Sequence, residues 1–151
     1  MTREYRTVSA DETIEVGRQI AKLLAARSVV VLTGDLGAGK TTLVKGIAEG
    51  FHAAQEEDVT SPTFTLVHEY RGPSVNLFHI DLYRIDTERE LFTLGIDDLI
   101  DSDSILLIEW GEKFERFRRE HDAEIAIRRV GESEREITIV VTGEARGREE
   151  N

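Results

Sequence analysis

Apolar residues in the first half of the chain fall into short runs, and each run has the spacing of one kind of element. Residues 29–32 are Val-Val-Val-Leu, a continuous apolar run typical of a buried strand. Ile14 and Ile20 recur at helical spacing after Ser9-Ala10-Asp11-Glu12, which reads as a capping box. The elements predicted here are a strand at about 3–8, a helix from 9 to about 26, the strand at 29–32 and a helix at about 40–49.

The second half of the chain alternates more often between apolar and polar residues. Residues 64–70 and 75–83 flank the turn Arg71-Gly72-Pro73-Ser74 and predict a hairpin. The continuous apolar run at 105–108 predicts another buried strand. The other elements predicted are a short helix at 87–94 closed by Gly95, a charged helix at about 112–119, and antiparallel strands at 123–130 and 135–141.

Length and composition indicate one globular unit. The chain has 151 residues, of which 40% are hydrophobic and 32% charged. We expect a single domain at 1–142, and a disordered tail at 143–151 because that segment offers no core residue to anchor it. There are no cysteines, no apolar stretch of membrane-spanning length and no signal-peptide core, so a cytoplasmic location is expected and a membrane role is not.

The charge balance argues against a free-standing nucleic-acid binder. Thirty acidic residues against nineteen basic ones give a formal net charge of −11. Proteins that bind nucleic acid unaided normally carry a basic stripe that displaces counterions. If nucleic acid is involved, we expect a partner protein to hold most of it.

The chemistry of the chain centres on residues 34–41, which read Gly-Asp-Leu-Gly-Ala-Gly-Lys-Thr directly after the apolar run at 29–32. This is the phosphate-binding loop G-x-x-x-x-G-K-[ST] between a strand and a helix. Its glycines let successive N–H groups point at phosphate oxygens, Lys40 adds a positive charge, and the Thr41 hydroxyl is placed to ligate Mg²⁺. The nucleotide-binding candidates are Asp35, Leu36, Gly37, Ala38, Gly39, Lys40, Thr41 and Thr42.

This loop predicts a three-layer α/β fold of the P-loop NTPase kind, with a mixed, mostly parallel central sheet and antiparallel additions. The nucleotide is inferred partly by elimination. Asparagine occurs only at positions 76 and 151, so the Asn-Lys-x-Asp element that reads guanine is missing. ATP is therefore favoured over GTP.

A phosphate-binding loop also needs an acidic group near the metal, usually at the carboxyl end of a neighbouring strand. Glu109 and Asp81 both end apolar runs and are the two candidates, and these runs do not decide which one touches the metal. The hydroxyl-rich segment 60–64 is a candidate nucleotide switch, although such a segment is more often an ordinary turn. His79 shares a strand face with Asp81, and we interpret it as structural.

Several segments in this order resemble the bacterial TsaE family, the ATPase component of tRNA threonylcarbamoyladenosine biosynthesis. The resemblance runs from about residue 9 to 113. The segments that carry it are Gly34-Asp35-Leu36-Gly37-Ala38-Gly39-Lys40-Thr41-Thr42-Leu43, Ser61-Pro62-Thr63-Phe64-Thr65-Leu66-Val67, His79-Ile80-Asp81-Leu82-Tyr83-Arg84, Leu94-Gly95-Ile96 and Ile108-Glu109-Trp110.

The resemblance implies a P-loop protein that binds ATP and ADP with Mg²⁺ and hydrolyses ATP slowly. It further implies partners of the TsaB and TsaD type, which transfer the threonylcarbamoyl group to tRNA while this chain resets their complex between turnovers. Contact with tRNA would then run mainly through these partners. Lys40, Asp81 and Glu109 would be catalytic, with Thr41 and Glu109 as metal ligands. The other implied roles are nucleotide contacts at Ser9 and Arg135, a switch at Ser61, Thr63 and Thr65, and a reporter position at Trp110.

Two other functions stay open at this point. A small-molecule phosphotransferase of the P-loop class is disfavoured, because no separate segment is available to close over a substrate. A nucleotide-gated binding module without meaningful hydrolysis is compatible with the sequence, because no residue is identifiable as a base that activates water.

Overall fold

The computed structural model describes residues 1–35, 37–53 and 67–142, which build one seven-stranded sheet. The strand order is β1-β7-β6-β2-β5-β4-β3. Strands β6, β2, β5 and β4 are parallel to one another, whereas β3 at one edge and β7 and β1 at the other are antiparallel additions. The predicted α/β fold with a mixed central sheet is confirmed. The strands are β1 (Thr2–Thr7), β2 (Ser28–Thr33), β3 (Val67–Arg71), β4 (Asn76–Asp81), β5 (Ser104–Glu109), β6 (Ala123–Arg129) and β7 (Arg135–Val141).

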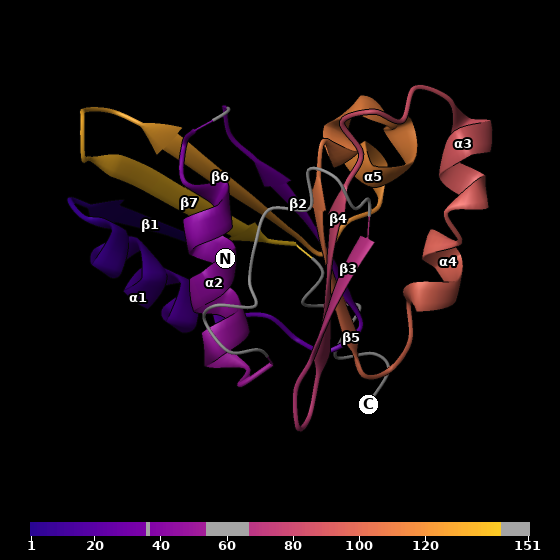
Figure 1. Ribbon diagram of the computed structural model, residues 1–151, viewed down its shortest axis with the longest axis horizontal. Helices are drawn as coiled ribbons and strands as arrows, with labels where there is room; N and C mark the ends of the chain where they lie inside the picture. Colours follow the sequence, from indigo (N-terminus) through magenta and orange to yellow (C-terminus); the bar gives the residue numbers. More distant parts are fainter. Residues whose placement is uncertain (36, 54–66, 143–151) are drawn as a thin grey trace.

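Helices cover the two faces of this sheet (Figure 1). They are α1 (Ala10–Ala21), α2 (Lys40–Gly50), α3 (Glu88–Thr93), α4 (Ile96–Leu99), α5 (Glu115–Arg119) and the short 3₁₀ helix η2 (Gly111–Lys113). Strand β2 shows how the core divides: Val30 and Leu32 pack with α1 and α2, while Val29 and Val31 pack with α3, α4 and α5. Burial on both sides explains why this strand is continuously apolar. None of the helices in the described ranges combines the length and the apolar composition needed to cross a membrane.

Helices α1 and α2 cross at glycines. A Cβ added to Gly17 would lie 2.6 Å from the carbonyl oxygen of Leu43, and one added to Gly46 would lie 2.1 Å from that of Ile14. The two backbones therefore approach more closely than any larger residue allows. This contact fixes the start of α1 beside the start of α2, which is the helix that follows the phosphate-binding loop.

Four local features differ from the predictions. Helix α1 ends at Ala21 instead of about residue 26, because the backbone turns at Lys22 and Leu24 reaches the core from that turn. The predicted helix at 112–119 is split at Phe114, whose backbone is extended and whose side chain is buried. Helix α4 was not predicted. In the capping box, Ser9 Oγ accepts from Glu12 N–H as expected, but Glu12 Oε1 accepts from the N–H of Val8 and not of Ser9.

Candidate functional site

The loop after β2 leads into the start of α2, which has no capping side chain among the described residues. Gly37 and Gly39 adopt positive φ angles of 79° and 108°, a region that glycine enters readily. Gly39 is the N-cap of α2, and no side chain within residues 1–35, 37–53 and 67–142 caps that helix, so its first N–H groups are left for another acceptor. Such a helix end attracts anions, because the N–H groups and the helix dipole point the same way. Leu36, one of the predicted loop contacts, lies outside the described residues.

Lys40, the first residue of α2, is nearly buried, with 10% of its side chain exposed. Its Nζ donates to the carbonyl oxygen of Gly34 at 2.7 Å and lies 3.3 Å from Oε1 of Glu109. The same ammonium group lies 5.5 Å from the centre of the Trp110 ring, within the range of a cation–π contact. The structure thus brings Lys40, Glu109 and Trp110 together at the carboxyl end of the parallel strands.

Glu109 ends β5 and is buried, with its carboxylate divided between two partners. Oε1 faces Lys40, and Oε2 lies 2.5 Å from Nε2 of His79. Burial alone would raise the pKa of this carboxyl, but the hydrogen bond and attraction of His79, followed by those of Lys40, outweigh it and lower the pKa below its ordinary value. The lowered pKa favours the ionised form of Glu109, which is the form that can accept hydrogen bonds and attract a cation.

Asp81 ends β4 and is the direct register partner of Glu109 on the neighbouring parallel strand. Its Oδ1 accepts a hydrogen bond from the N–H of Tyr83 at 2.9 Å, which holds the chain where it leaves the sheet. The Tyr83 ring in turn contacts Trp110, with ring centres 5.2 Å apart. Both acids that the sequence singled out therefore lie side by side at the carboxyl ends of two neighbouring parallel strands.

A pocket of about 210 Å³ lies on the other side of the start of α2. Arg135, the first residue of β7, connects its walls: Nε donates to the carbonyl oxygen of Ala38 in the loop, at 2.8 Å, and another guanidinium nitrogen donates to that of Glu134, at 3.1 Å. Ser9 and Thr13 reach the pocket because α1 packs so closely on α2. The lining residues are Ser9, Ala10, Thr13, Gly39, Thr42, Glu132, Ser133 and Arg135.

The predicted residues thus form two neighbouring groups joined by α2. Lys40, Glu109, Asp81 and Trp110 lie at the strand ends, and Ser9, Gly39, Thr42 and Arg135 surround the pocket. Thr41 lies between Lys40 and Thr42 in the first turn of α2. The backbone N–H of Ala38 donates to the backbone carbonyl oxygen of Asp35 at 2.9 Å. The predicted switch residues Ser61, Thr63 and Thr65 lie outside the described residues.

Glu132, Ser133 and His79 lie in this region and were not singled out from the sequence as functional. Glu132 and Ser133, in the turn between β6 and β7, line the pocket, and no motif marks them. His79, interpreted as structural, contacts Glu109 directly. The available signal was its position two residues before Asp81 on the same strand face, but its partner becomes visible only once β4 is placed beside β5.

A parallel strand, a glycine-rich loop, an uncapped helix bearing a lysine, and an acid at the end of the adjacent strand define a P-loop nucleotide-binding protein. The sequence model of one family, described as "Threonylcarbamoyl adenosine biosynthesis protein TsaE", matches residues 7–137. The chain belongs to the TsaE family. Membership in this family implies nucleotide binding.

Similar proteins cover nearly the whole chain. The tRNA threonylcarbamoyladenosine biosynthesis protein TsaE of Bacillus subtilis is 39% identical over 140 residues, covering 93% of this chain and 86% of its own. The protein of the same name from Treponema pallidum is 39% identical over 131 residues, covering 87% and 95%. The crystal structure of Bacillus subtilis YdiB superimposes with a TM-score of 0.72 at 32% identity, covering 100% of this chain and 97% of that one.

Proposed function

We propose that this protein is the Mg²⁺-dependent ATP-binding component of the tRNA threonylcarbamoyladenosine machinery. It hydrolyses ATP slowly and thereby resets a complex of TsaB- and TsaD-type partners between turnovers. The observation that carries the proposal is the meeting of Lys40 and Glu109 at 3.3 Å beside the uncapped start of α2. Membership in the TsaE family supports the pathway, and the pocket beside Thr42 supports a nucleoside position next to the phosphates.

The residues present fit a magnesium ion. Mg²⁺ prefers oxygen ligands and is commonly held by one or two carboxylates together with substrate phosphates. The Thr41 hydroxyl and the ionised Glu109 carboxylate supply such oxygens. In the described part of the chain no group of three or more His, Asp or Glu residues could hold a metal alone, so phosphate oxygens would complete the ligand set. When bound, the ion would neutralise charge on the phosphates that hydrolysis separates.

The protein's own groups then have distinct tasks. The loop N–H groups and the start of α2 hold the phosphates, and Lys40 exchanges its contact with Glu109 for phosphate oxygens. Glu109 is then free to ligate the metal, and Asp81, paired with it in register, is needed for hydrolysis. Ser9 and Arg135 contact the nucleoside in the pocket. Ser61, Thr63 and Thr65 form the segment that responds to the nucleotide.

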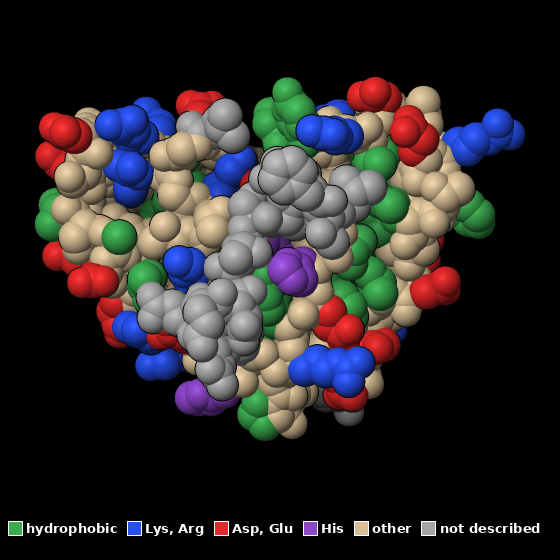
Figure 2. All heavy atoms as spheres, viewed as in Figure 1, with side chains coloured by type: hydrophobic (Ala, Val, Ile, Leu, Met, Phe, Trp, Pro, Cys, Tyr) green, Lys and Arg blue, Asp and Glu red, His purple; other side chains and the backbone are tan. Residues whose placement is uncertain are grey.

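The surface charge supports a role on a protein complex, and we propose that this complex works in the cytoplasm. Figure 2 shows Lys and Arg side chains interspersed with Asp and Glu on the face it presents, without one continuous basic patch. With a net charge of −11, the chain repels a polyanion, so the partners would hold most of the tRNA. Under this proposal residues 1–142 act as one ATPase domain. Trp110 lies close to Lys40 and responds to nucleotide or partner.

The deciding experiment follows the γ-phosphate of labelled Mg-ATP, first with the chain alone and then with TsaB- and TsaD-type partners and tRNA. We expect slow release of inorganic phosphate that rises with the partners, together with repeated rounds of tRNA modification. Label on a small molecule would identify a phosphotransferase instead. Partner binding that differs between ADP and a non-hydrolysable triphosphate, without phosphate release, would identify a gated binding module.

A further inference from the structure

His79 is buried and yet makes one polar contact. Its side chain is 0% exposed, in the middle of β4, and its Nε2 lies 2.5 Å from Oε2 of Glu109. The other ring nitrogen, Nδ1, has no hydrogen-bond partner among the residues that the structure describes. A buried polar atom without a partner lowers the stability of the fold, so an apolar residue would give a more stable protein here if packing were the only role of this position. The contact with Glu109 is what a histidine adds at this position.

The two oxygens of Glu109 have unequal partners. A carboxylate oxygen accepts hydrogen bonds, so in the 2.5 Å contact the ring N–H at Nε2 of His79 is the donor. His79 lies in the interior of a central strand, whereas Lys40 is the first residue of α2 and carries a long, flexible side chain. The fixed contact therefore falls on Oε2 and the exchangeable one on Oε1, which faces Lys40 at 3.3 Å.

We propose that His79 is a positioning residue that holds Oε2 of Glu109, so that Oε1 can exchange Lys40 for the metal of Mg-ATP. The inference rests on the proposed nucleotide site and assigns a function to a residue that the sequence marked only as structural. Groups that orient a metal-ligating side chain typically contribute about 10- to 100-fold to metal affinity. The same contribution is expected here, without any contact between His79 and the nucleotide.

The test uses Trp110, the only tryptophan of the chain, as a fluorescent probe of ATP binding. ATP is titrated with Mg²⁺ and again with a chelator, and the ratio of the two affinities gives the magnesium-dependent gain. His79→Leu removes the donor and keeps an apolar side chain, whereas His79→Gln keeps an amide N–H near the position of Nε2. We expect His79→Leu to reduce the magnesium-dependent gain in ATP affinity about 10- to 100-fold and to leave metal-free ATP affinity within about twofold of the wild type. His79→Gln is expected to restore part of the gain.

A double-mutant cycle with Glu109→Gln separates positioning from packing. If His79 acts through Glu109, adding His79→Leu to Glu109→Gln causes no further loss of the gain. Equal losses with and without metal, or an additive loss in the double variant, would assign His79 a packing role and overturn the inference. Because His79→Leu can fail to fold, the second variant is His79→Asn, whose amide donor is too short to reach Oε2, and we expect it to lose the magnesium-dependent gain as His79→Leu does.

The wild type distinguishes this inference from the proposed function. A wild-type protein with no magnesium-dependent gain would overturn both. A gain in the wild type that His79→Leu and His79→Asn retain in full would overturn the positioning role alone.

Discussion

At the scale of single residues, Lys40 offers the most direct test of the proposed phosphate site. Its ammonium group already has two oxygen partners, Gly34 O and Glu109 Oε1, and phosphate oxygens would replace them. A hydrogen bond to a charged group contributes about 1.5–3 kcal/mol, which corresponds to about 10- to 100-fold in affinity. We expect Lys40→Ala to weaken Mg-ATP binding by that factor in isothermal titration calorimetry, and to abolish function in the assembled pathway while the fold survives.

Lys22→Ala provides the control for this substitution, because Lys22 is exposed at the end of α1, away from the loop. It should bind Mg-ATP as the wild type does. Unchanged affinity in Lys40→Ala would remove this residue from the phosphate site.

Glu109 carries a prediction about acid stability. In the folded protein its pKa lies below the ordinary value, since His79 and Lys40 outweigh the opposing effect of burial. A carboxyl whose pKa falls on folding stabilises the protein above its unfolded pKa, and that stabilisation is lost as the pH drops through the folded value. In urea unfolding below about pH 5, the wild type should therefore lose more free energy of unfolding than Glu109→Gln. The exposed Glu120→Gln variant controls for the loss of one acid, and identical pH slopes in the wild type and Glu109→Gln would contradict the prediction.

At the scale of elements, the α1–α2 crossing determines whether the pocket exists. Alanine is a better helix former than glycine by about 1 kcal/mol, so Gly46→Ala would stabilise an isolated helix. Here the new Cβ would lie 2.1 Å from the carbonyl oxygen of Ile14 and push the helices apart. We expect a net loss of about 1–3 kcal/mol in the free energy of unfolding, measured in urea, together with weaker Mg-ATP binding.

Gly131→Ala is the matched control for this crossing. A Cβ there would meet nothing closer than 3.4 Å, which is ordinary contact. A Gly46→Ala protein as stable as Gly131→Ala would show that the crossing tolerates a wider spacing.

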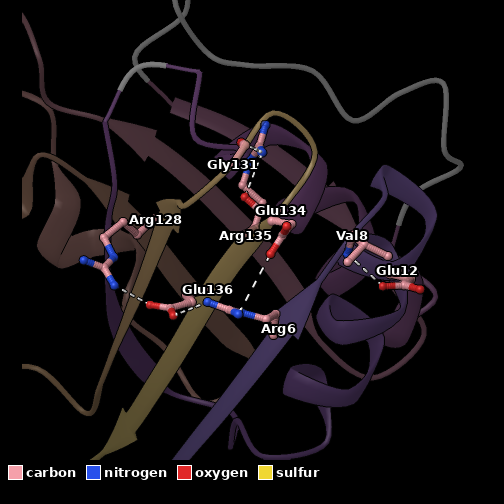
Figure 3. Close-up of polar contacts among 8 residues, drawn as sticks. All are labelled: Arg6, Val8, Glu12, Arg128, Gly131, Glu134, Arg135 and Glu136. Carbon is pink, nitrogen blue, oxygen red and sulfur yellow. Dashed lines mark hydrogen bonds and ion pairs between the residues drawn. The ribbon is translucent and has the colours of Figure 1, made fainter.

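The outer face of the antiparallel strands shows what cross-strand pairing adds to an element. Arg6 on β1 and Arg128 on β6 both bind Glu136 on the intervening β7, and Arg6 also lies 3.9 Å from Glu134 (Figure 3). The two arginines lower the pKa of Glu136. Opposite charges directly across a ladder favour one register over a slipped one, because a shift of one residue moves each side chain to the other face.

The sequence predicted elements better than their arrangement. Residues 29–32 and 105–108 were assigned as buried strands because burial on both faces demands an uninterrupted apolar run. The division at Phe114 was missed because one buried aromatic residue breaks a helix whose charged pattern continues across it. The contact between His79 and Glu109 could not be predicted, because it depends on the register of β4 against β5. Ser9 and Arg135 were named from the family resemblance, and the structure adds a pocket between them.

At the scale of the whole molecule, net charge governs contact with RNA. A chain with a formal charge of −11 gains little from counterion release on a polyanion. We expect fluorescence anisotropy of labelled tRNA to give a Kd weaker than about 10⁻⁴ M for the chain alone at physiological salt, the weak end of non-specific binding. Addition of TsaB- and TsaD-type partners should recruit the tRNA. Tight, steeply salt-dependent binding by the isolated chain would show that it carries an RNA-binding basic surface of its own and would contradict the prediction.

The position of β1 has a consequence for folding during synthesis. This strand lies at the edge of the sheet and pairs with β7, from Thr2 opposite Val140 to Thr7 opposite Arg135. On the ribosome, β1 emerges before the other strands of this sheet, and its hydrogen-bonding partner β7 is synthesised after all of them. The central strands β2, β4 and β5 can assemble earlier, whereas the β1 edge stays unpaired until β7 has been made. Contacts between distant parts of a sequence form slowly and leave strand edges exposed to other chains meanwhile. A nascent chain stalled before residue 135 would therefore carry its β1 segment without a partner.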